Sequence, residues 1–145
     1  MARRIFFASP EYSAGDLELI DSLLLRLEVV TQGRLKGSDL FVPHLNVGDY
    51  DVDVPAQQWV DKCLAALKEA DIVVCVLNGR QADDGTAYFL GVAHALGKYT
   101  IGYLSERRQL PHPALLNACT VNVYGGAKEL GAALLEGLAR VGPQA

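Results

Sequence analysis

Short hydrophobic runs alternate with longer amphipathic segments along the whole chain. The runs 4–9, 39–44, 72–77, 99–104 and 119–124 each have the length of a β-strand and are bounded by turn-forming or polar residues. In 72–77, Ile-Val-Val-Cys-Val-Leu, polar and apolar positions do not alternate. That pattern predicts a strand that is buried on both faces, as in a parallel sheet.

The segments between these runs have the hydrophobic spacing of helices. In 16–30, large aliphatic residues recur every three or four positions, which places one apolar face on a helix. A glycine near the end of 86–98 fits the carboxyl end of another helix. Helices are expected over 16–30, 56–69, 86–98 and 126–141, with a short turn or helix at 114–118.

Strands that alternate with helices predict a parallel sheet covered by helices on both faces. We expect one α/β domain over residues 1–145, a doubly wound five-stranded sheet in the flavodoxin-like order 2-1-3-4-5. Ligands of such sheets bind beyond the carboxyl ends of the strands, where the strand order reverses. This rule selects the loop 9–12 after the first strand and the loop 78–86 after the third.

Composition and charge narrow the function classes. The net charge of −4 argues against a nucleic-acid polymer as partner, whereas a free nucleotide needs only a few backbone N–H groups. No apolar run approaches the roughly 20 residues that span a bilayer. The three cysteines have no Cys-x-x-Cys spacing, and no cluster has metal-ligand spacing. No Gly-x-Gly-x-x-Gly motif follows the first strand, so a dinucleotide cofactor is not expected. We expect a cytoplasmic protein that binds no metal and no cofactor and does not associate with a membrane.

The loop 78–86 has the residue types of a ligand site. Asp83 or Asp84 can cap the following helix by accepting N–H bonds from its first turn. Gly85 lets a ligand approach the backbone closely, and Thr86 offers a hydroxyl beside the free N–H groups. An ordinary N-cap on a surface helix explains the same residues equally well.

Several stretches resemble the nucleoside 2-deoxyribosyltransferase family. In that family an Ala-Asp-strand segment leads into Asp-x-Gly-Thr-x-x-Glu-x-Gly-x-Ala-x-Ala-x-Gly-Lys, and here 70–79 is followed by 83–103 in the same arrangement. The opening 5–13 resembles the family's first strand and base-binding turn, and 41–44 its second strand. The residues that match the longer pattern are Asp83, Gly85, Thr86, Gly91, Ala93, Ala95, Gly97 and Lys98.

The resemblance implies cleavage or exchange of the N-glycosidic bond of a nucleoside, through a glutamate that forms a glycosyl-enzyme. That glutamate belongs three residues after Thr86, where this chain has Phe89. A second family carboxylate, eight residues before Asp71, falls on Cys63. Asp83 is the one matching acid of the three, so the chain is interpreted as a divergent member without the catalytic glutamate.

No residue is identified as catalytic. Glu11 and Asp84 lie in loops that could reach the pocket. Cys63 could be a nucleophile but is more simply a buried thiol. Tyr88 is turned by about 100° from the direction of Phe89 on a helix.

The loops and the resemblance together nominate the ligand-binding residues. Tyr12 could stack on a base or cover the core, and Asn117 resembles an amide that reaches the neighbouring subunit's site in the family. The nominated residues are Ser9, Pro10, Tyr12, Asn78, Asp83, Asp84, Gly85, Thr86, Phe89, Cys63 and Asn117.

Two function classes stay open. The first is a protein that binds a nucleoside or nucleotide at the carboxyl edge of the sheet without standard transferase activity. The second is an N-glycosidic bond hydrolase or transferase on (deoxy)nucleosides or nucleotides that uses a non-standard nucleophile.

The resemblance and the apolar segments 17–30 and 127–141 also predict a homodimer or higher homo-oligomer, with loop 45–55 near the neighbour's pocket. The alternative is that both segments simply pack on their own sheet.

Overall fold

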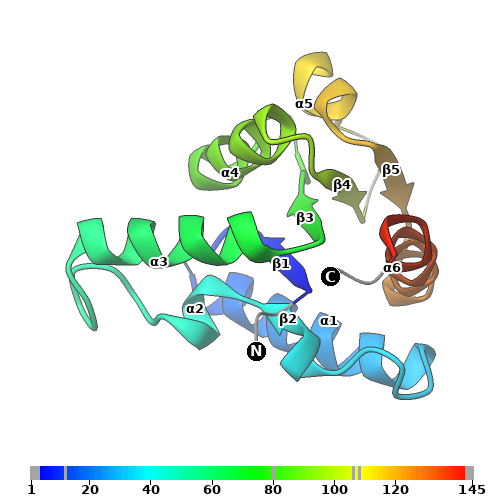
Figure 1. Cartoon of the computed structure of the whole chain (residues 1–145), viewed down its shortest axis with the longest axis horizontal. Coiled ribbons are helices and arrows are strands. Elements are labelled where there is room, and N and C mark those ends of the chain that lie inside the picture. Colours follow the sequence, from blue (N-terminus) through cyan, green and yellow to red (C-terminus); the bar gives the residue numbers. More distant parts are fainter. Residues whose placement is uncertain (1–3, 12, 80, 106, 108, 143–145) are drawn as a thin grey trace.

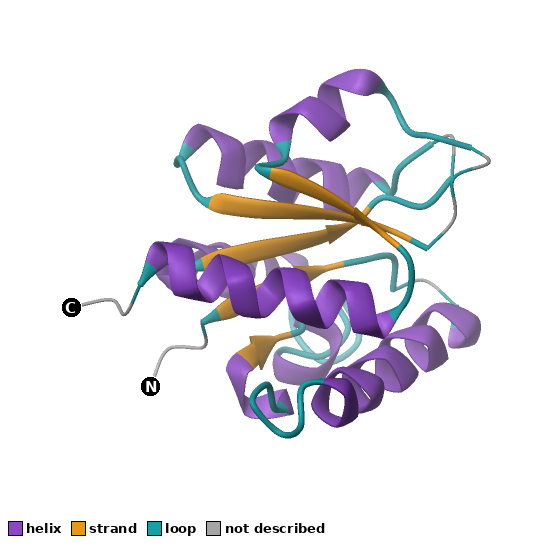
Figure 2. Ribbon diagram, turned by 90° about the vertical axis from the view of Figure 1, so that its right-hand side faces the viewer, coloured by secondary structure: helices purple, strands orange, loops and turns teal. Residues whose placement is uncertain are grey.

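The computed structural model of the chain describes residues 4–11, 13–79, 81–105, 107 and 109–142. Its strands form one parallel sheet in the order β2-β1-β3-β4-β5, with helices on both faces (Figures 1 and 2). The predicted fold class and strand order are confirmed. The strands are β1 Ile5–Ala8, β2 Leu40–Phe41, β3 Ile72–Val76, β4 Tyr99–Leu104 and β5 Val121–Tyr124.

The helices form two layers around this sheet (Figure 1). Helices α1 and α6 cover one face, and α3, α4 and α5 cover the other. None of the helices in the described part of the chain has the length and apolar character needed to cross a membrane. Their bounds are α1 Ala14–Val30, η1 Gly37–Asp39, α2 Pro43–Asn46, α3 Ala56–Glu69, α4 Asp84–Ala95, α5 Pro113–Ala118 and α6 Ala127–Val141.

The second predicted strand is much shorter than expected. The run 39–44 was predicted to be a strand, but only Leu40–Phe41 pair with β1. Pro43 opens the short helix α2 instead. Proline lacks the N–H that a strand would use and has a φ angle suited to the first helical turn, so it ends the strand and starts the helix.

The central strands separate two hydrophobic clusters. Successive side chains of a strand point to opposite faces of the sheet. Ile5 and Phe7 therefore pack with α1 and α6, whereas Phe6 and Ala8 pack with α3 and α4. All five residues of β3 are buried, as the continuous apolar run predicts.

The carboxyl ends of β1 and β3 bring two distant loops together. Ala8 at the end of β1 lies opposite Cys75 near the end of β3. The loop that follows Ala8 and the loop that leads from β3 to α4 therefore start side by side. The strand order reverses between these two strands, which is where an open α/β sheet forms a ligand crevice.

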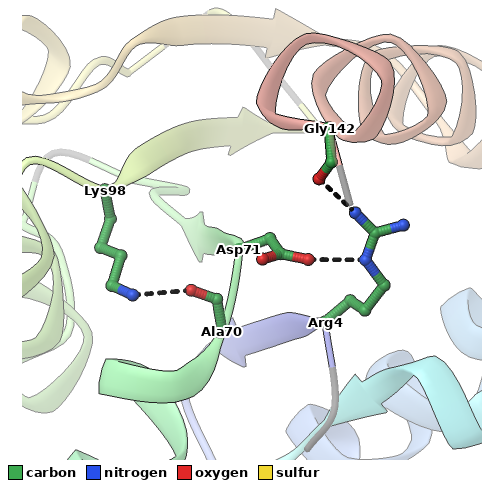
Figure 3. Close-up of polar contacts among 5 residues, drawn as sticks. All are labelled: Arg4, Ala70, Asp71, Lys98 and Gly142. Atoms are coloured by element: carbon green, nitrogen blue, oxygen red, sulfur yellow. Dashed lines mark hydrogen bonds and ion pairs between the residues drawn. The ribbon is translucent and has the colours of Figure 1, made fainter. Parts of the chain in front are cut away.

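The amino end of the sheet is fixed by polar contacts (Figure 3). The Nε atom of Arg4 donates to Asp71 Oδ2 at 2.6 Å, and Nη2 of Arg4 donates to the Gly142 carbonyl at 3.0 Å. Lys98 Nζ donates to the Ala70 carbonyl at 2.8 Å. These contacts tie together β1, β3 and the ends of α3, α4 and α6. Asp71 and Lys98 thus stabilise the fold at the edge opposite the carboxyl ends of the strands.

Candidate functional site

A cavity of about 180 Å³ lies at the carboxyl edge of the sheet, where the strand order reverses. The rings of Tyr50, Trp59 and Phe89 form part of its wall, and Glu11 and Asp83 add two carboxyl groups. These side chains come from the β1 loop, the segment before α3, α3 itself and the start of α4. The remaining lining residues are Ala8, Ser9, Pro43, Gly85 and Thr86.

The start of α4 is organised by one side chain. Asp83 is the N-cap, as the sequence predicted, and its Oδ2 accepts hydrogen bonds from the Thr86 N–H and the Thr86 hydroxyl, each at 2.9 Å. This cap fixes the carboxyl group of Asp83 at the mouth of the helix. Asp84, the other predicted cap, is the first helical residue; it is exposed and does not line the cavity.

Phe89 occupies the wall of the cavity one turn after Thr86. Its side chain is 5% exposed, and its ring centroid lies 5.2 Å from that of Phe6 and 6.1 Å from that of Trp59. Residue 89 therefore faces the cavity with a packed aromatic ring. Tyr88 is 51% exposed and does not line the cavity, as the helical rotation predicted.

Glu11 lines the cavity, whereas the sequence analysis placed it only in a loop that could reach the pocket. Its Oε1 and Oε2 accept the His44 backbone N–H at 2.8 and 3.3 Å, so a loop after β1 caps the first turn of α2. Burial raises the pKa of Glu11 to about 7; the negative charges of Asp49 and Asp83 add to the rise, and the His44 hydrogen bond opposes it. The carboxyl group is therefore partly protonated at neutral pH.

Cys63 lies behind the wall rather than on it. The residue is fully buried in the cluster of Phe6, Leu67 and Phe89, and it does not line the cavity. Burial and the nearby charge of Glu11 raise the pKa of the Cys63 thiol to about 12. A thiol with this pKa stays protonated near neutrality, which argues against a thiolate nucleophile.

The other nominated residues are distributed over three places. Ser9 lines this cavity and also the second cavity described next, and its buried Oγ has no hydrogen-bond partner among the described residues. Pro10 and Asn78 line a second cavity of about 270 Å³, formed with α1 on the other face of the sheet. Asn117 is exposed on α5, away from both cavities. Tyr12 lies outside the described residues.

The described residues contain no group of three or more His, Cys, Asp or Glu side chains that could hold a metal ion. The cavity instead combines aromatic walls with a neutral or ionised Glu11 and the Asp83 carboxyl. Such a set can hold a flat ring and hydrogen-bond its polar edge.

The chain is similar to several solved structures. A conserved protein from Enterococcus faecalis V583 is 17% identical, with 97% of this chain and 99% of that chain covered and a TM-score of 0.71. The 2-deoxyribosyltransferase of Bacillus psychrosaccharolyticus is 20% identical, with 81% and 83% covered and a TM-score of 0.64. The CMP N-glycosidase BcmB of Clostridium botulinum is 23% identical, with 91% and 98% covered and a TM-score of 0.54. At these identities the likeness shows a shared fold.

Among curated protein sequences, none matches the chain. The sequence pattern of one family does match, over nearly the whole domain. Residues 5–136, from the first residue of β1 to within α6, fit the family described as nucleoside 2-deoxyribosyltransferase. The chain therefore belongs to the nucleoside 2-deoxyribosyltransferase family.

Proposed function

We propose that the cavity binds a nucleoside or nucleotide and that the protein does so without the base exchange of the transferases. The observation that carries this proposal is Phe89, a packed aromatic ring at the position of the family's nucleophile, in a wall that it shares with Trp59 and Tyr50. A base stacked on such rings gains about 1–3 kcal/mol per contact. The wall thus favours binding a flat ring over attacking a sugar.

The polar side of the cavity fits the sugar of the ligand. Asp83 is held at the first turn of α4, where its carboxyl group can accept a hydrogen bond from a sugar hydroxyl. Asp83 adds a negative charge to the cavity, which disfavours a phosphate group deep inside it. We infer that the enclosed part takes the nucleoside and that any 5′-phosphate remains toward the solvent.

Hydrolysis of the N-glycosidic bond is the second candidate function. One observation favours it: a carboxyl group with a pKa of about 7, Glu11, shares the cavity with a second carboxyl group, Asp83. Inverting glycosidases pair an acid with a base that activates water. In this scheme Glu11 gives its proton to the leaving base, and Asp83 takes a proton from the water that attacks the anomeric carbon. Free base and free sugar would accumulate together.

A thermal-shift screen across nucleosides and nucleotides tests the binding proposal. At a ligand concentration of 100 Kd the folded state gains about 2.7 kcal/mol, so a binder raises the melting temperature measurably. Trp59→Leu should reduce the shift, because it removes a wall of the cavity. Tyr88→Ala is the matched control on the exposed side of α4 and should leave the shift unchanged. Chromatography of the same samples distinguishes binding from hydrolysis.

We also propose a homo-oligomer, as the sequence predicted. The outer face of α1 leaves Leu25 and Val29 69% and 76% exposed, and Val52 of the loop 45–55 is 80% exposed. On α6, by contrast, the described large apolar side chains pack inward apart from Val141. We therefore expect α1 and the loop 45–55, rather than α6, to meet a second copy. Light scattering should give a multiple of 15.6 kDa; a mass of one chain contradicts the proposal.

A further inference from the structure

The two carboxyl groups of the cavity differ in their unused hydrogen-bonding capacity. The Glu11 carboxyl group accepts one backbone N–H, from His44, although a carboxylate has about four acceptor positions. Asp83 has less acceptor capacity left for a ligand, because its Oδ2 already accepts two hydrogen bonds from Thr86. Glu11 therefore has the larger unused capacity for polar contacts in the cavity.

The surroundings of Glu11 favour its neutral form. Burial is the largest cause, and the charges of Asp49, between α2 and α3, and Asp83, at the start of α4, add to it. On α3 the neighbouring Cys63 is neutral. On α2 the His44 backbone N–H donates to the carboxyl group of Glu11, which opposes the rise in pKa. The two ion pairs found in the described residues involve Arg4 and Arg140 and do not reach Glu11.

Protonation changes which partner Glu11 can pair with. An ionised carboxylate presents acceptors only, whereas a neutral carboxyl group presents one O–H donor beside one acceptor. The neutral form is complementary to a ring nitrogen beside an amino group, which is the edge that adenine and cytosine offer. The ionised form is complementary to two adjacent donors, which is the edge that guanine offers.

We propose that Glu11 recognises the base of the bound nucleoside as the neutral acid and thereby selects an amino-substituted base, adenine or cytosine. This inference rests on the proposed function, because it assigns the ligand of the same cavity. The rings of Tyr50, Trp59 and Phe89 line the cavity, and Glu11 lines the same cavity from a different element.

The affinity for adenosine and cytidine should fall as the pH rises. Burial raises the pKa of Glu11, so the neutral acid predominates below pH 7 and is lost above it. For a pKa of about 7, calorimetric titration should show roughly tenfold weaker binding at pH 8 than at pH 6. Guanosine and inosine, which present a ring N–H, should bind more weakly at pH 6 and should not lose affinity over this range.

Two variants separate this role from a structural one. Gln has an N–H donor and an acceptor in the places of the neutral acid at every pH. Glu11→Gln should therefore keep the affinity that the wild type has at pH 6, and the affinity should not change up to pH 8. Asp49→Asn removes a negative charge that raises the pKa of Glu11, so it should move the fall in affinity to lower pH.

The outcomes are distinguishable. If adenosine or cytidine binds with the same affinity from pH 6 to pH 8, the assignment to Glu11 is overturned while the binding function stands. A Glu11→Gln variant that keeps the wild-type pH dependence overturns it as well. If no nucleoside binds at any pH, the proposed function of the cavity itself fails. Circular dichroism verifies that Glu11→Gln folds. If this variant does not fold, the pH dependence of adenosine and cytidine binding by the wild type alone tests the role of Glu11.

Discussion

Phe89→Glu should lower the free energy of unfolding by about 3–5 kcal/mol at pH 8, and by clearly less at pH 5. The substitution removes a ring that packs against Phe6 and Trp59, and it places a carboxyl group in a position that is 5% exposed. Burial raises the pKa of the new glutamate in the folded state. The penalty is therefore complete above that raised pKa and is relieved as the pH falls toward the ordinary value for glutamate. Urea unfolding at both pH values measures the difference.

Phe89→Leu is the matched control for the lost ring. Leu keeps the position apolar, so this variant should lose about 1–2 kcal/mol, by the same amount at both pH values. The difference in stability between Phe89→Glu and Phe89→Leu therefore measures the cost of burying the charge, separately from the cost of losing the ring. If Phe89→Glu is as stable as Phe89→Leu at pH 8, the side chain at this position is open to water and the wall described here is wrong.

The second large effect concerns catalysis. We expect no exchange between deoxyinosine and free adenine, because residue 89 offers no atom that can form the glycosyl-enzyme. Removal of a nucleophile from a well-studied serine protease costs on the order of 10⁶-fold in kcat. A loss of that size puts exchange below detection in a chromatographic assay.

A nucleoside 2-deoxyribosyltransferase that has the glutamate is the positive control for this assay. It should form deoxyadenosine under the same conditions, and the present protein should not. Robust formation of deoxyadenosine by this chain contradicts the assignment of Phe89. In that case, mass spectrometry of the trapped glycosyl-enzyme would identify the residue that replaces it.

The fold could be predicted from the sequence because its signals are local. Continuous apolar runs such as 72–77 and the helical spacing of 16–30 need no knowledge of distant residues. The Asp83 cap is local too, since its partner is Thr86, three residues on. The shortened β2 is an exception, and its cause is also in the sequence: Pro43 can begin a helix but cannot continue a strand.

The cavity could be predicted only in part, because its decisive contacts join residues far apart in the chain. The raised pKa of Glu11 follows from its burial and from the charges of Asp49 and Asp83, and it is opposed by the His44 hydrogen bond; these three residues lie 33 or more positions away along the chain. Cys63 was nominated from its place in the family pattern, but the packing of α3 puts it behind the wall. A role for Asn117 depends on a second copy of the chain, which one sequence cannot position.

The most direct test of the central claim is a fluorescence titration of Trp59. This residue is the one tryptophan of the chain, it lines the cavity, and its Nε1 is fixed by a hydrogen bond to the Gly48 carbonyl at 2.9 Å. A base that enters the cavity contacts the indole, so adenosine or cytidine should change the emission in a saturable manner. An emission that changes only linearly with ligand, as that of free tryptophan does, would contradict nucleoside binding at this site.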